Sequence, residues 1–280
     1  MGIIPSTGAT IPQRRLGIEC AHKFGDCVLN TGLIREASTR YGCKIGVAVR
    51  DLYADAFIGN PHIDEIVRIH NMGEGPAAFK KLGYKSSHIA TQNIRFFEFK
   101  AHGEHSLIDT PLMVGKGMGL REFNHKPELF LSQAEIESVS AVKDSRPIIA
   151  IESVFTSGQS WATPDCFSLI VDKLQSTHKI LWLSNQGAPN GSNIDNMLRF
   201  SRRQVIAALR HVDVFFSVGS GFFCSTLGLD RSSQPKKIVC LWNDDMYRYK
   251  DRLNELKWHP DITWCLNREA FLDALCNIKS

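Results

Sequence analysis

Short apolar runs alternate with amphipathic stretches along most of the chain. In the first half, runs at 16–21, 44–49, 63–69, 88–92 and 126–131 predict strands, and helical spacing predicts helices over 52–58, 77–82, 108–118 and 133–143. A further helix follows the first strand, with Leu29, Leu33, Ala37 and Tyr41 recurring at a spacing of four. In the second half, strands are predicted at 148–152, 179–184, 212–218, 237–242 and 262–266, and helices at 164–175, 202–210, 222–228 and near the C-terminus.

This alternation restarts once. The charged stretch 143–147 ends in a proline and precedes a new apolar run. Two successive series of strands and helices are typical of an α/β protein with two Rossmann-like parallel-sheet domains that face a cleft. We therefore expect a flexible lead-in at 1–14, one domain at 15–145 and a second at 146–280.

Composition and charge narrow the class of protein. The chain has 280 residues, 43% of them apolar, and a formal net charge of +4. This mild excess suits anionic ligands and permits contact with DNA or with a membrane surface, but it falls short of a dedicated nucleic-acid binder. The basic residues that could contact an anionic acceptor, or that could equally form a solvated basic face, are Lys80, Lys81, Lys85, Arg95 and Lys100.

The eight cysteines form no CxxC pair, which predicts a reducing compartment such as the cytoplasm and no structural zinc. No run of 18 apolar residues and no signal-peptide pattern occurs in the sequence.

The turn after the first strand carries the leading catalytic candidate. Asp26 stands where the following helix should begin, which predicts an N-cap. In a parallel sheet, ligands bind beyond the carboxyl ends of the strands, so its carboxylate would lie at the rim of the cleft. A capping role and a catalytic role are both compatible with this position.

Three polar loops in the second half also follow strands. The loop 153–163 is rich in hydroxyls, which together with amides at a helix start can bind phosphate oxygens. The turn Gly219-Ser220-Gly221 directly precedes a helix and would let the backbone approach a diphosphate. The loop 183–193 offers amide side chains for a nucleobase or a sugar. Each loop can also be interpreted as an ordinary capped loop or turn.

Several common chemistries lack their motifs. The sequence has no GxGxxG fingerprint, no Walker lysine motif, no nucleophile elbow and no metal-ligand spacing such as HExxH. The tight acidic pair Asp244-Asp245 is more typical of a solvated loop than of a metal site. Hydride transfer, phosphoryl transfer from a P-loop and metal-dependent hydrolysis are therefore poorly supported.

Taken in order, the motifs resemble a known family. GDCVLNTGLIREASTRY followed by KIGVAVRDLYADAFIGNPHIDEIV, then LIDTPLMVGKGMGL, KPELFLSQAEI, IAALRHVDVFFSVGSGFFCSTLGL and KKIVCLW are similar to the lipopolysaccharide heptosyltransferases of glycosyltransferase family 9, enzymes with the GT-B fold. The resemblance covers about residues 15–275.

The resemblance implies a metal-independent, inverting transfer of a sugar from a nucleotide-sugar donor to an acceptor hydroxyl, with no cofactor beyond that donor. Asp26 falls on the family's catalytic base. The donor would contact the second domain, and the acceptor, a saccharide or a modified DNA base, would contact the first. The candidate donor residues are Thr156, Ser157, Gln159, Ser160, Asn185, Gln186, Gly219, Ser220, Gly221 and Phe222, and the candidate acceptor residues are His22, Lys23, Asn30, Gln92 and Arg95.

The chain departs from the family at four positions. Gly219 and Cys224 stand where the family usually has an aspartate and a histidine, Gln159 stands where it has a lysine, and Gly32 stands where it has a proline. ADP-heptose is therefore not assumed as the donor. The alternative is a non-catalytic relative that binds a nucleotide sugar or a glycan. An isomerase is less favoured, because the sequence gives no second acid or base a defined place.

These inferences set the expected location and partners. The protein would act in the cytoplasm, in the host cytoplasm if a phage encodes it, with contact to the membrane surface permitted. No obligate protein partner is evident from the sequence.

Overall fold

The computed structural model describes residues 16–20, 23–89, 109–153, 160–184, 189, 191, 193–243, 249–259 and 261–278. The expected lead-in at 1–14 lies outside these ranges. The prediction of an α/β chain with two parallel sheets is confirmed.

The first sheet has four parallel strands in the order β3-β2-β1-β4. They are β1 (Leu16–Glu19), β2 (Ile45–Arg50), β3 (Ile63–Ile69) and β4 (Ser86–Ile89). The helices of this half are α1 (Phe24–Leu29), α2 (Thr31–Tyr41), α3 (Gly75–Lys81) and α5 (Thr110–Gly117). A 3-10 helix at Asp51–Ala56 takes the place of the predicted helix over 52–58.

The second sheet has six parallel strands in the order β10-β9-β8-β5-β6-β7. They are β5 (Ile148–Ile151), β6 (Lys179–Trp182), β7 (Ile194–Asn196), β8 (Val214–Ser217), β9 (Lys237–Leu241) and β10 (Ile262–Cys265). This is the doubly wound order of a dinucleotide-binding sheet. The first three strands follow one another toward one edge, and the fourth strand starts again beside the first and leads toward the other edge. Here that switch point lies between β5 and β8.

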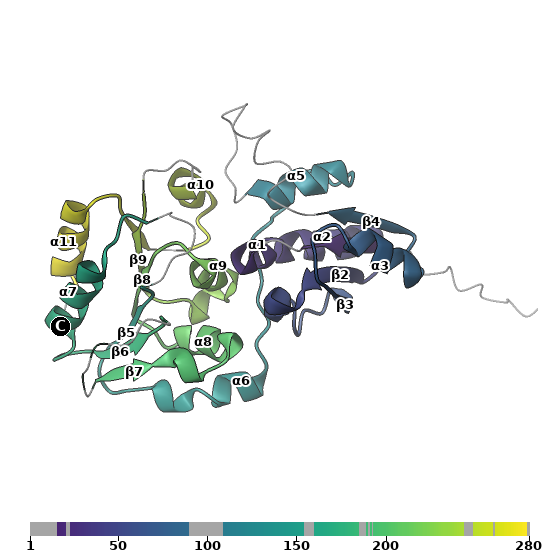
Figure 1. The fold of residues 1–280 in the computed structure, drawn as a ribbon. Helices are drawn as coiled ribbons and strands as arrows, with labels where there is room; N and C mark the ends of the chain where they lie inside the picture. The colour runs from purple at the N-terminus through teal and green to yellow at the C-terminus, as the bar shows by residue number, and fades with distance from the viewer. Residues whose placement is uncertain are drawn as a thin grey trace, which may run out of the picture.

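Helices cover both faces of the second sheet (Figure 1). One face packs against α7 (Pro164–Leu174) and α11 (Arg268–Cys276) in a separate apolar cluster. The other face packs against α8 (Arg202–Leu209) and α9 (Gly221–Gly228), which lie on the side toward α1. One cluster of buried apolar residues runs from the first sheet through α1 and α9 to this second face, so the two halves share a core at this place.

The segment between the halves differs from its prediction. The apolar run 126–131 forms no strand, because its backbone bonds to the ends of other elements instead. The Glu128 amide donates to Thr31 Oγ at 2.7 Å, and the Leu129 amide donates to the carbonyl of Gly228 at 2.8 Å. At Gly32 a Cβ would lie 2.4 Å from the carbonyl oxygen of His125, so this crossing segment requires glycine where the resembled family has proline.

Other predicted boundaries also change. The predicted helix over 133–143 divides into α6 (Gln133–Glu137) and a 3-10 turn at Ser140–Val142. Two unpredicted elements appear, β7 and α10 (Tyr249–Leu256). The sequence of α10 is mostly polar, and Leu253 is its fully buried anchor, so it shows little helical periodicity.

Candidate active site

A tight turn follows β8 at the switch point of the second sheet. Gly219 has φ +72°, and a Cβ there would lie 1.6 Å from Cζ3 of Trp242, so both the backbone conformation and the close packing require glycine. Ser220 is the N-cap of α9, and its Oγ accepts a hydrogen bond from the Phe222 amide at 3.1 Å. The turn thus presents a half-buried serine and a helix N-terminus, a combination suited to an anionic group.

A buried carboxyl group, Glu152, lies beneath this turn at the end of β5. It is 3% exposed, and its amide donates to the carbonyl of Phe216 at 3.0 Å. Ser217 Oγ donates to its Oε2 at 2.8 Å, and Ser220 Oγ donates to its Oε1. Burial raises the pKa of Glu152 to about 7, while hydrogen bonds from both serines and from the Val218 amide lower it in part.

Asp26 lies on α1, which packs against α9. The helix begins at Phe24, so Lys23 is its N-cap and the prediction of Asp26 as N-cap is wrong. Asp26 is the third residue of the helix, half-buried, and its Oδ2 accepts a hydrogen bond from the Lys23 amide at 3.2 Å. The helix is six residues long, so the carboxylate stays close to the end of β1.

The contact between α1 and α9 places Asp26 near the turn of the second sheet. A Cβ at Gly25 would lie 3.1 Å from Cys224 Sγ and 3.3 Å from the Cα of Gly221, so a glycine lets the helices approach this closely. Burial raises the pKa of the Cys224 thiol, and the charges of Asp26 and Glu152 raise it further. The thiol is therefore neutral, and it lies within reach of the charges of both carboxylates.

Some of the remaining predicted site residues lie within the described ranges and the others lie outside them. Lys23 is exposed, Asn30 is buried with Nδ2 donating to the carbonyl of Asp26 at 2.9 Å, and Ser160 is buried with Oγ accepting from the Ala162 amide at 3.1 Å. Gly219, Ser220, Gly221 and Phe222 are together at the start of α9. Outside the described residues lie His22, Gln92, Arg95, Thr156, Ser157, Gln159, Asn185 and Gln186.

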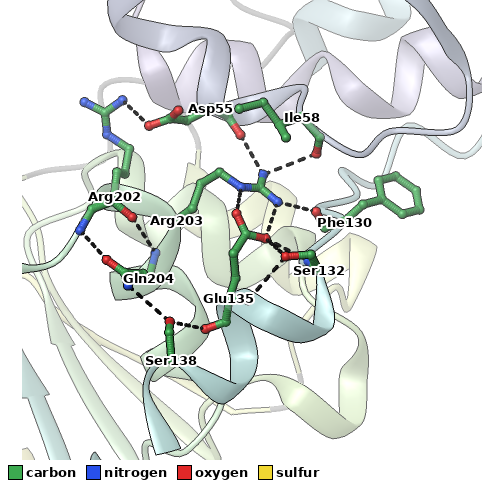
Figure 2. A network of polar contacts seen from close by, with 10 residues as sticks. Asp55, Ile58, Phe130, Ser132, Glu135, Ser138, Arg202, Arg203 and Gln204 are labelled. Atoms are coloured by element: carbon green, nitrogen blue, oxygen red, sulfur yellow. Dashed lines mark hydrogen bonds and ion pairs between the residues drawn. The ribbon is translucent and has the colours of Figure 1, made fainter.

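A polar network joins the two halves (Figure 2). Arg203 on α8 is 5% exposed and pairs through Nε and Nη2 with both carboxylate oxygens of Glu135 on α6. Its Nη1 donates to the carbonyls of Asp55 at 2.9 Å and of Ile58 at 3.2 Å, and its Nη2 donates to the carbonyl of Phe130. One guanidinium therefore ties the second sheet to the first half and to the connecting segment.

Its neighbour Arg202 also contacts the first half. Its guanidinium lies over the ring of Phe24, 4.5 Å from the centroid, and its Nη1 donates to the carbonyl of Leu52 at 2.6 Å. Both arginines come from the first turn of α8, and Arg202 is the one that contacts α1.

Glu152, Ser217 and Arg203 are the important residues that the sequence did not reveal. Glu152 stood at the end of a predicted strand, and the serines that bond to it lie 65 and 68 residues later. A carboxylate at the end of an apolar run at the switch point is the one signal that could have indicated it. Nothing in the spacing of Arg203 separates it from an ordinary solvated helix residue.

Two further observations concern ions and membranes. Across the residues that the structure describes, no group of three or more His, Cys, Asp or Glu side chains is placed to hold a metal ion. None of the helices in those residues combines the length and the apolar character needed to cross a membrane.

Known structures share this fold. A family 9 glycosyl transferase from Veillonella parvula matches with a TM-score of 0.68 and 12% identity, over 95% of this chain and 90% of that one. The E. coli ADP-heptose LPS heptosyltransferase II matches at 0.66 and 12% identity, over 93% and 98% of the two chains. This chain has the GT-B fold of these glycosyltransferases.

A third match also covers most of both chains. The E. coli heptosyltransferase WaaC with ADP-2-deoxy-2-fluoro heptose matches at a TM-score of 0.53 and 11% identity, over 90% of this chain and 92% of that one. No protein-family model and no curated protein matches the sequence. At these identities the similarity establishes the fold alone.

Proposed function

We propose that the protein is a glycosyltransferase that moves a sugar from a nucleotide-sugar donor to an acceptor hydroxyl. The observation that carries the proposal is the approach of α1 to α9, which brings Gly25 against Gly221 and puts Cys224, on the first turn of α9, within reach of the charge of Asp26. The fold shared with known glycosyltransferases supports it. The similar enzyme WaaC is known with ADP and with an ADP-heptose analogue, which favours a nucleotide-sugar donor here.

The reaction we propose is a single displacement without a metal ion. Asp26 accepts the proton of the acceptor hydroxyl while the oxygen of that hydroxyl bonds to the anomeric carbon of the donor sugar. The bond from that carbon to the diphosphate breaks on the opposite face, which inverts the configuration, and the nucleotide leaves as a diphosphate. The N-terminus of α9 and the Ser220 hydroxyl supply partial positive charge for that leaving group.

The test replaces Asp26 with asparagine. Asn keeps a side-chain oxygen for the Lys23 amide but cannot take up the proton, so turnover should fall by about a hundredfold or more. Release of free nucleotide from a panel of nucleotide sugars measures turnover, and calorimetry measures donor binding, which should persist. Asp165→Asn is the matched control, since it removes an exposed carboxylate from the first turn of α7 on the opposite face of the second sheet. Retained turnover in Asp26→Asn contradicts the base role.

A second candidate function follows from Gly219 and Cys224. These residues stand where the resembled family has an aspartate and a histidine, and the buried Cys224 thiol carries no charge that could replace either. A non-catalytic protein that binds a nucleotide sugar or a glycan fits this loss. Donor binding without nucleotide release, over a panel of saccharide acceptors, would favour this second function over transfer.

The acceptor and the place of action also belong to the proposal. Lys80 and Lys81 at the end of α3 and Lys85 in the turn after it are exposed together, which suits an anionic acceptor such as modified DNA or an anionic saccharide. Binding to DNA that falls steeply with salt concentration would support the nucleic-acid version. Action in the cytoplasm, with contact to a membrane surface, stays a prediction that fractionation of cells can test.

A further inference from the structure

Glu152 is a buried carboxyl group for which the proposed displacement has no use. It lies directly under the turn that would hold the donor diphosphate, and both of its oxygens are bonded to serine hydroxyls. An anion below an anion site opposes binding, because the low dielectric of the interior leaves the repulsion poorly screened. Its presence there therefore needs an explanation.

The described residues that interact with Glu152 come from β8, the turn after it, α9 and β9. From β8 and its turn come two hydroxyls and a backbone amide, and from α9 and β9 come two buried thiols whose pKa values its charge raises. Asp26, on α1, also raises the pKa of one of those thiols. No lysine, arginine or histidine of the described chain contributes to the charge balance of Glu152. These groups are Ser217, Val218, Ser220, Cys224 and Cys240.

The two serines differ in what else they can reach. Ser217 is fully buried, and its Oγ also accepts from the Gly219 amide at 3.1 Å. Ser220 is half-buried at the surface of the turn, and its Oγ also accepts from the Phe222 amide. While the carboxylate is ionised, the single hydroxyl proton of Ser220 is directed at Glu152 and is withheld from any ligand.

A proton on Glu152 reverses this hydrogen bond. The carboxylic acid then donates to Ser220 Oγ, which can accept two hydrogen bonds, and the serine O–H is released to donate outward. The same proton removes the negative charge beneath the turn. Both changes favour a diphosphate at the start of α9.

We propose that Glu152 is a positioning residue that turns the Ser220 hydroxyl toward or away from the diphosphate of the donor, so that the donor binds together with one proton. The inference rests on the proposed function, since it concerns the same donor site. Linkage makes the effect reciprocal, so a bound diphosphate raises the affinity of Glu152 for its proton. The raised pKa of Glu152, about 7, places this exchange near neutral pH.

Donor binding as a function of pH tests the inference. Nucleotide sugars are suitable probes because their diphosphate diester keeps the same charge between pH 6 and 8.5, so we choose ADP-glucose, UDP-glucose and GDP-mannose. The dissociation constant of the wild type should rise about tenfold per pH unit above the pKa of Glu152, or about 30-fold between pH 6 and 8.5. Calorimetry in buffers of different ionisation enthalpy should show uptake of about one proton at pH 8.

Three variants separate the positioning role from a merely structural one. Glu152→Gln carries no charge at any pH, so its donor affinity should be independent of pH and stronger than that of the wild type at pH 8.5. Ser220→Ala should weaken binding at pH 6, because it removes the hydroxyl that would reach the diphosphate. Ser217→Ala is the matched control. It removes a hydrogen bond that lowers the pKa of Glu152, and the buried Ser217 hydroxyl does not itself reach a ligand. The dependence of donor affinity on pH should therefore move to higher pH, with binding at pH 6 unchanged.

The outcomes decide the inference separately from the proposed function. Binding without proton uptake, or an equal pH profile in Glu152→Gln, overturns the inference while leaving transfer with Asp26 as base intact. No binding of any of the three probes at pH 6 also overturns it. If Glu152→Gln does not fold, the presence or absence of proton uptake by the wild type still supports or overturns the inference. The role of Asp26 is decided by turnover alone.

Discussion

The buried guanidinium of Arg203 offers the sharpest test of how the two halves are held together. The perturbation is Arg203→Met, which keeps a long apolar stem and removes the charge and all donors. It leaves the carboxylate of Glu135 without this partner and takes a donor from the carbonyls of Asp55, Ile58 and Phe130 (Figure 2). Part of the segment between the halves and part of the first half then lose one of their links to α8, while Arg202 still donates to the carbonyl of Leu52.

The magnitude follows from burial. Breaking a buried ion pair by removing one partner costs about 3–5 kcal/mol, because the remaining charge and acceptors stay partly desolvated. Since the Glu135 side chain is 23% exposed, we take about 4 kcal/mol for Arg203→Met. For Glu135→Gln we expect about 2 kcal/mol, since the guanidinium keeps its three carbonyl partners. The double variant should cost about 4 kcal/mol, which is a coupling of about 2 kcal/mol.

Urea unfolding at pH 7 of the four proteins of this cycle measures that coupling. Arg146→Met is the matched control, because Arg146 makes the same two-fold pair with Asp144 at 2.9 Å for both bonds, but its side chain is 35% exposed and the pair is local. It should cost about 1 kcal/mol or less. A cost of Arg203→Met as small as that of the control, or a coupling near zero, would refute the reasoning from burial.

The same pair has a pH signature. The hydrogen bonds from Arg203 lower the pKa of Glu135 to about 2, from an ordinary value of 4.5. A lowered pKa means that this stabilisation is fully present above pH 4.5 and is lost as the pH falls toward 2. Arg203→Met should remove this part of the acid dependence of the urea midpoint.

Two further predictions concern the turn at the switch point. Gly219→Ala should lower the free energy of unfolding in urea by about 3 kcal/mol or more, since a clash with Trp242 adds to the cost of a positive φ, about 1 kcal/mol. Gly73→Ala, with φ +93° and open space around its Cβ, should show only the cost of the positive φ. Equal costs of the two variants would contradict the packing argument. Glu152→Gln should be more stable than the wild type at pH 8 by about 3 kcal/mol and nearly equal to it at pH 4. The reason is that folding raises the pKa of Glu152 from 4.5 to about 7, so the wild type loses stability as the pH rises through that interval. Thermal and urea unfolding from pH 4 to 8 measure this difference, and a gap that does not depend on pH would contradict it.

The order of strands and helices could be predicted from the local sequence pattern, because the apolar residues of most of these elements recur at the spacing of that element. The buried runs of β5, β8 and β9 are continuous in sequence, and α7 carries its apolar residues at helical spacing. The prediction of a strand over 126–131 was wrong because an apolar run indicates that a segment is buried but not which element it packs against. Here the partners are the start of α2 and the end of α9, and none of the described strands pairs with the segment.

The candidate site could be predicted only in part. The glycine turn before α9 and the acidic residue after β1 are recognisable by residue type. The position of Asp26 within α1 was not predictable, because the structure uses Lys23 as the N-cap and Asp26 to bond its amide. Candidate residues in the loops 154–159 and 185–188 stay predictions, since they lie outside the described ranges.

By itself the sequence determined the alternation of strands and helices, the polar ends of the strands and one carboxylate near the first of them, because those features depend on neighbours within a few residues. Only the tertiary structure decided that Glu152 lies under Ser220, that α1 packs on α9 and that Arg203 joins three segments. Those contacts join residues from 68 to about 200 positions apart. Burial, and with it charge state, is a property of such distant neighbours, so no local pattern records it.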